Sequence, residues 1–117
     1  MPGNKYHAQP CQGYHSKLEA AVGKILDFRL RAGEIDELRR QHAVSLGGRK
    51  WKCDFSYRNK RTGVTVWVEA KGFVTREWLW IKEMWKLIGP GRLEVWGGHY
   101  SRPFTTEVLE GGRNGQP

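Results

Sequence analysis

The sequence predicts an α/β protein, a mixed sheet of about four strands flanked by helices in the order αβββαβ. Three observations indicate this fold class: an amphipathic helical pattern near the N-terminus, two strand-like stretches joined by a short turn, and a second, strongly apolar helix that a further strand follows. With 117 residues and 38% hydrophobic content, the chain suits one globular domain. We expect that domain over residues 14–110, between a flexible N-terminal arm (1–13) and a Gly-rich, disordered tail (111–117).

The first helix is predicted to begin at Ser16. Glu19 follows three residues later, which gives the Ser-x-x-Glu pattern of a capping box. Apolar side chains then recur with helical spacing to about Ala32, and Gly33 is a typical residue just past a helix end. The stripe consists of Leu18, Val22, Ile25 and Arg29, with Leu26 beside it. A strand is expected next, over residues 38–46.

Two strand-like stretches, 50–58 and 64–72, flank a Gly-containing turn and predict a β-hairpin. If the hairpin closes symmetrically about that turn, Asp54 lies opposite Glu69. Because side chains alternate along a strand, Lys71 then shares one face with both acids. The same face also carries Lys52, Ser56 and Trp67. The opposite face is apolar and consists of Trp51, Cys53, Phe55, Tyr57, Val66, Val68 and Ala70.

Two opposed carboxylates on one face of a sheet reduce its stability. Like charges at such positions repel, by roughly 4 kcal/mol for bare carboxylates about 4 Å apart at an effective dielectric near 20. A divalent cation, the neighbouring lysines, or both would compensate. The alternative is a solvated charged face on which Lys–Asp and Lys–Glu pairs have no further role. The hairpin pattern alone leaves both interpretations open.

A second helix is predicted from Thr75, a suitable N-cap, to Ile88, and a last strand over residues 92–96. The apolar residues of this helix are too many for a single stripe. One row consists of Trp78, Ile81, Trp85 and Ile88, and a second row of Trp80, Met84 and Leu87. One row can cover the sheet, so the other needs a further partner. We expect that partner to be a second copy of the chain, in a homodimer.

The charge of the chain favours a nucleic-acid partner. The formal net charge is +8, and basic residues concentrate in the predicted hairpin. Phosphate contacts are expected from Lys17, Lys52, Arg58, Lys60, Arg61 and Lys82. No apolar run reaches the ~20 residues of a membrane span, so a membrane is not an expected partner. A polar N-terminus and only two cysteines lead us to expect a cytoplasmic protein.

Four polar residues occur in the order of a known nuclease motif. Glu19 lies in the first predicted helix, Asp54 in the second strand, and Glu69 and Lys71, separated by Ala70, in the third. With the helix and strand that follow, this order resembles the PD-(D/E)xK nuclease superfamily, whose core is the restriction-endonuclease-like fold.

The resemblance extends to other short pieces of the chain. Small phage endonucleases of this superfamily are similar in the Ser16-Lys17-Leu18-Glu19 opening, the Arg40-Gln41 pair and the Lys71-Gly72-Phe73 segment. Archaeal-type Holliday-junction resolvases share the same small architecture. The proline of the motif is replaced by Cys53, at a position that shapes the strand and does not bind metal in the family.

The resemblance implies the chemistry of a metal-dependent DNA endonuclease. Asp54, Glu69 and the Ala70 carbonyl would hold Mg²⁺, for which Mn²⁺ would substitute. Lys71 would orient or help deprotonate the attacking water. Glu19 would complete the catalytic set by binding a second ion or by holding a water of the first. No small-molecule cofactor is implied.

The expected substrate is branched DNA. A small, basic, dimeric enzyme without an added recognition domain suits a structure-selective nuclease, such as a phage-type Holliday-junction resolvase, because paired nicks need two active sites at a fixed separation. A phage-encoded enzyme would act in the host cytoplasm. The alternatives are a nuclease of low sequence specificity that acts on duplex DNA, and a non-catalytic DNA-binding module with the same fold.

Overall fold

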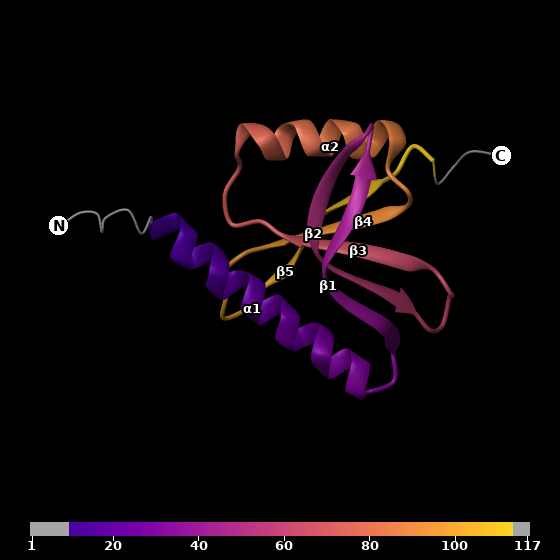
Figure 1. Ribbon diagram of the computed structural model, residues 1–117. Coiled ribbons are helices and arrows are strands. Elements are labelled where there is room, and N and C mark those ends of the chain that lie inside the picture. The colour runs from indigo at the N-terminus through magenta and orange to yellow at the C-terminus, as the bar shows by residue number, and fades with distance from the viewer. Residues whose placement is uncertain (1–9, 114–117) are drawn as a thin grey trace.

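The protein is an α/β structure with a five-stranded mixed sheet and two helices, as a computed structural model that describes residues 10–113 shows. The strands follow one another in the sheet in the order β1-β2-β3-β4-β5, and all neighbours are antiparallel except β3 and β4, which are parallel. Helices α1 and α2 lie on opposite sides of the sheet (Figure 1). The elements are α1 (Pro10–Arg31), β1 (Ile35–Leu46), β2 (Arg49–Asn59), β3 (Thr65–Ala70), α2 (Arg76–Ile88), β4 (Arg92–Gly97) and β5 (Phe104–Glu110).

Helix α1 begins at Pro10, six residues earlier than predicted. Ser16 therefore lies inside the helix, and the capping-box interpretation is wrong. The predicted end is confirmed: Gly33 has a left-handed backbone (φ 78°), and the Glu34 amide donates to the Arg29 carbonyl oxygen at 3.0 Å, as in a Schellman turn. The predicted stripe packs against the sheet, and its fully buried members are Leu18, Val22 and Leu26.

The two ends of the chain differ from the predicted arm and tail. Of the arm, residues 10–13 belong to α1, and residues 1–9 lie outside the described part of the chain. Of the tail, residues 111–113 pack against the end of α2, where the Gly111 amide donates to the Gly91 carbonyl at 2.8 Å. Residues 114–117 are again outside the described part.

The predicted register of the β2–β3 hairpin is confirmed. Four residue pairs form a regular antiparallel ladder, and each pair is the one expected from symmetric closure about the turn. These pairs are Phe55–Val68, Ser56–Trp67, Tyr57–Val66 and Arg58–Thr65. The ladder stops there, and β3 itself ends at Ala70, so the strand is shorter than the predicted 64–72.

The apolar face predicted for the hairpin is divided between two cores. Five of its members pack with α1, and they are Phe55, Tyr57, Val66, Val68 and Ala70. Cys53 and Trp51 instead pack with α2, so the prediction of one continuous face is wrong for these two. The cause is the twist of a long two-stranded ribbon, which carries β1 and β2 from the end of α1 up to α2 (Figure 1). A register shift in β1 between Asp36 and Arg39 adds to this bend.

Helix α2 has the predicted start and leaves apolar surface uncovered. The Trp78 amide donates to the Thr75 hydroxyl at 3.1 Å, which confirms the N-cap. Trp78, Ile81 and Trp85 are buried against the sheet. On the outer side, Leu79, Trp80 and Leu87 remain 52%, 37% and 68% exposed. No helix within residues 10–113 is long and apolar enough to cross a membrane.

Strand β5 was not predicted. It pairs antiparallel with β4 at one edge of the sheet, and Leu109 is its buried residue. Because its other side chains are exposed or half-buried, the segment lacks the strong apolar alternation by which a strand is recognised in a sequence.

Candidate metal centre

Two acidic side chains replace the backbone ladder where β2 and β3 diverge. The Asp54 amide donates to Glu69 Oε1 at 3.1 Å, and the Ala70 amide donates to Asp54 Oδ2 at 2.9 Å. Each carboxylate thus accepts a hydrogen bond from the backbone of the opposite strand. Asp54 and Glu69 are only 7% and 4% exposed. The structure therefore brings the two predicted acids together and fixes both of them.

Lys71 lies at the same place, just past the end of β3. Its Nζ atom is 3.3 Å from Glu69 Oε2 and 5.0 Å from the centre of the Trp78 ring, which comes from α2. The Lys71 amide donates to the Trp96 carbonyl oxygen at 2.9 Å and holds the backbone in line with β4. The ammonium group is thus directed at the acid pair by both ion pairing and an aromatic neighbour.

Helix α1 supplies two further side chains near Asp54, those of Glu19 and His15. These residues are four positions apart and project from the same face of the helix. One ligand atom of each, together with one of Asp54, lies within 4.8 Å of the other two. Gln41, in a left-handed backbone conformation (φ 53°) on β1, donates to Glu19 Oε2 at 3.2 Å.

Burial disfavours the charged form of both acids in the cluster. Burial raises the pKa of Glu69 to about 8, and the charge of Asp54 adds to that shift while Lys71 opposes it. Burial also raises the pKa of Asp54 to about 6; the Ala70 hydrogen bond opposes this and the charge of Glu19 adds to it. Asp54 and Glu69 thus share the positive charge of Lys71. Carboxylates in this position fit a divalent cation, which would let them ionise.

His15 is half-buried and contributes an imidazole nitrogen to the same cluster. Burial, followed by the charge of Lys71, lowers the pKa of His15, while Glu19 opposes that shift. Its Nδ1 atom is buried without a hydrogen-bond partner in the described part of the chain. The imidazole ring meets Phe73 edge-on, with ring centroids 5.9 Å apart.

The residues that could hold a cation fall into two groups that share Asp54. The predicted group is Asp54, Glu69 and the Ala70 carbonyl, and in it the Glu69 oxygens contact the Asp54 amide and Lys71. The other group is His15, Glu19 and Asp54. The first group offers only oxygen donors, which suits Mg²⁺ or Mn²⁺, whereas the second adds the imidazole nitrogen of His15.

Sequence reasoning missed His15 and Gln41 as members of the site. A helix starting at Ser16 leaves His15 outside it, so the His-x-x-x-Glu spacing on one helical face is apparent only when the helix starts at Pro10. Gln41 was noted in the family resemblance but was given no role, because its direction depends on a left-handed backbone that its residue type does not announce.

Of the predicted DNA contacts, two are already paired with acids. The guanidinium nitrogens of Arg58 lie 2.6 Å from Asp36 Oδ2 and 3.6 Å from Glu37 Oε2. Lys82 Nζ lies 2.9 Å from Glu107 Oε1. These ion pairs reduce the charge that Arg58 and Lys82 can offer to phosphate.

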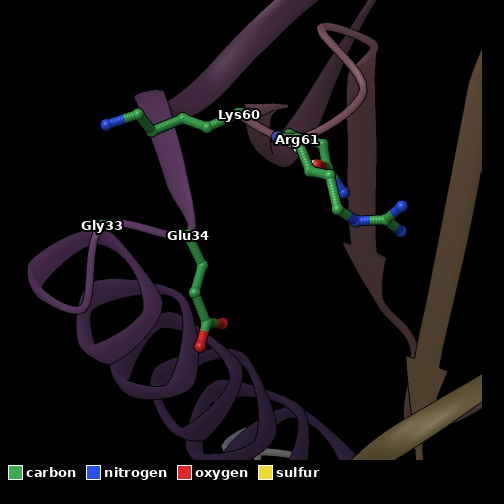
Figure 2. Close-up of a pocket in the computed structure, with 5 residues that line it drawn as sticks. Gly33, Glu34, Lys60 and Arg61 are labelled. Atoms are coloured by element: carbon green, nitrogen blue, oxygen red, sulfur yellow. Dashed lines mark hydrogen bonds between the residues drawn. The ribbon is translucent and has the colours of Figure 1, made fainter.

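The other four predicted contacts are spread over the surface. Lys60 and Arg61 border a hollow of about 490 Å³ near the turn between β2 and β3, and their side chains point apart while Glu34 points toward α1 (Figure 2). The hollow is lined by Gly33, Glu34, Asn59, Lys60 and Arg61. Lys17, exposed on α1, has its Nζ 5.1 Å from the Tyr100 ring centre, and Lys52 is exposed on β2.

Comparison with known proteins adds no relative. No family model matches the chain, and no curated protein and no solved structure is significantly similar to it. The resemblance to PD-(D/E)xK nucleases therefore depends on the motif residues of the sequence.

Proposed function

We propose that the protein is a metal-dependent DNA endonuclease of the PD-(D/E)xK type, with a restriction-endonuclease-like core. The observation that carries the proposal is a pair of hydrogen bonds across β2 and β3, beside Lys71: the Asp54 amide donates to the Glu69 carboxylate, and the Ala70 amide donates to the Asp54 carboxylate. The order of the elements through β4, with β3 and β4 parallel, is compatible with the αβββαβ core.

The proposed chemistry is hydrolysis of a phosphodiester. Asp54, Glu69 and the Ala70 carbonyl would hold Mg²⁺ or Mn²⁺, which when bound supplies a Lewis acid for the phosphate and lowers the pKa of water. Lys71 would orient the attacking water and offset charge as the new oxygen–phosphorus bond forms and the sugar oxygen leaves. Glu19, held by Gln41, is placed to orient a water or to bind a second ion.

The proposed substrate is branched DNA cut by a dimer. The net charge of +8 favours a polyanion, and the exposed apolar side of α2 offers a surface for a second copy of the chain. Two sites related by a two-fold axis suit paired nicks at a four-way junction. A protein that acts on DNA and has the buried free thiol of Cys53 fits the cytoplasm.

Cleavage of two labelled substrates tests the proposal. A four-way junction and a linear duplex of the same arm sequence are incubated with the protein in Mg²⁺, Mn²⁺ or EDTA at matched salt. We expect metal-dependent nicks, mainly in the junction, that Glu69→Gln reduces at least ~100-fold. Glu110→Gln, at an exposed position on the edge strand β5, is the matched control and should cut like wild type.

The possible results separate the alternatives. Equal cutting of both substrates would retain the nuclease and replace junction selectivity by low-specificity action on duplex DNA. Shifted but uncut DNA under every metal condition would overturn the enzyme and favour a DNA-binding module. Cutting by Glu69→Gln at the wild-type rate would show that the site lies elsewhere.

A further inference from the structure

His15 adds a nitrogen atom to a cluster otherwise made of oxygens. It precedes Glu19 by one helical turn on α1, so both side chains face Asp54 on β2. Their potential ligand atoms lie within 4.8 Å of one another. Atoms that bind one ion at distances near 2 Å are about 3–4 Å apart, so small side-chain adjustments would close this group around a cation.

The surroundings hold the three ligands in place. Gln41 donates to Glu19, and the Ala70 amide donates to Asp54, so both carboxylates are oriented by other residues. The ring of His15 abuts Phe73. A buried ring nitrogen without a partner is unfavourable, and coordination to a cation would satisfy an imidazole lone pair.

We propose that His15, Glu19 and Asp54 form a second ion site that takes a transition-metal dication, from the series Mn²⁺ to Zn²⁺, in preference to Mg²⁺. Imidazole nitrogen suits transition metals, whereas Mg²⁺ demands oxygen ligands in a near-ideal octahedron. For its role the site rests on the proposed function, in which Asp54 also serves the ion held with Glu69. Ion binding itself requires no DNA, so it can be measured separately.

Manganese binding to the full-length, metal-free chain tests this site. Electron paramagnetic resonance counts free Mn²⁺ during a titration, and its pulsed form detects nitrogen bonded directly to the ion. We expect a ¹⁴N modulation that changes when the protein is labelled with ¹⁵N-histidine. His15→Gln should abolish the modulation and weaken Mn²⁺ binding at this site about tenfold or more, while Mg²⁺ affinity, measured by displacement, changes less than about threefold.

The matched control is His99→Gln, which alters an exposed histidine between β4 and β5 and should leave both readings unchanged. The absence of a histidine modulation in wild type would overturn the inference, even if His15→Gln failed to fold. Equal weakening of Mn²⁺ and Mg²⁺ binding by His15→Gln would overturn the preference.

The two proposals can fail separately. Histidine-bound Mn²⁺ in a protein that cuts no DNA would remove the nuclease and retain the ion site. Metal-dependent cutting without histidine-bound Mn²⁺ would do the reverse.

Discussion

The pairing of β2 with β3 changes character along its length. At residues 55–58 and 65–68 the strands form a regular ladder, and the side chains that meet α1 are apolar and buried. Just beyond the end of this ladder, the backbone amides of Asp54 and Ala70 each donate a hydrogen bond to a carboxylate of the facing strand. Burial stabilises the first region, whereas in the second it disfavours the charged form of two acids. The contrast indicates that the ladder maintains the fold, and it is the reason that we propose ion binding as the role of the acids.

The largest expected effect comes from the regular region. Phe55 is 1% exposed, and Phe55→Ala should lower the free energy of unfolding by ~3–5 kcal/mol because it leaves a cavity under α1. Urea denaturation measures the change. Phe104→Ala on β5 is the control: that ring is 57% exposed, and its loss should cost less than about 1 kcal/mol. Similar losses in both variants would mean that the ladder region is not the stabilising half.

Metal should stabilise the protein through the acidic region. At a concentration 100 times its dissociation constant, a bound Mg²⁺ or Mn²⁺ should add about 2.7 kcal/mol to the free energy of unfolding. Asp54→Asn should lose most of this gain. The side-chain oxygen of the new asparagine can still accept the hydrogen bond from the Ala70 backbone amide, but it carries no charge to bind the ion. Thermal denaturation with and without EDTA provides the measurement, and an undiminished shift in Asp54→Asn would contradict a specific site.

Removal of the Glu69 charge should stabilise the metal-free protein. Because the folded pKa is raised from 4.5 to about 8, the folded state binds this proton more tightly than the unfolded chain does. Protonation of Glu69 therefore contributes its full stabilisation of the folded state below pH 4.5, and this contribution is lost as the pH rises to about 8. In EDTA, the free energy of unfolding of Glu69→Gln should exceed that of wild type by about 4 kcal/mol at pH 8, and the difference should vanish near pH 4.5.

The measurement is urea denaturation at the two pH values. Glu83→Gln, an exposed change of the same type, should show no comparable difference. A Glu69→Gln variant that is less stable than wild type at pH 8 would mean that Lys71 already compensates the buried charge.

Sequence reasoning reached the regular region and the acid pair because both depend on short-range patterns. The turn before Val64 and the two-residue alternation fix the register, and the register places Asp54 beside Glu69. Thr75 likewise marks the start of α2, because its own hydroxyl accepts the capping hydrogen bond from the Trp78 amide.

What the sequence did not show depends on long-range structure. Helix α1 begins at Pro10, since proline is well tolerated in the first turn of a helix, whereas a start predicted at Ser16 leaves His15 outside the helix. The split of Cys53 from Phe55 results from ribbon twist, and β5 is defined by pairing with β4 more than by its own burial.

The smallest expected change in stability lies on the outer side of α2, where Leu87→Glu introduces an acid at a 68% exposed position. Unlike the buried Glu69, this carboxylate keeps its water, so the free energy of unfolding of the monomer should change by less than about 0.5 kcal/mol. The same charge would lie in the proposed dimer interface, and sedimentation should therefore shift from dimer to monomer. Leu79→Glu, which also lies on that side, should act alike, whereas Val108→Glu on β5 is an exposed control that should leave the dimer intact.

A wild-type protein that sediments as a monomer at all concentrations would remove the dimer and leave each acid cluster to act alone. A dimer that survives both helix variants would place the interface on another face, and the exposed apolar row of α2 would then need a different partner.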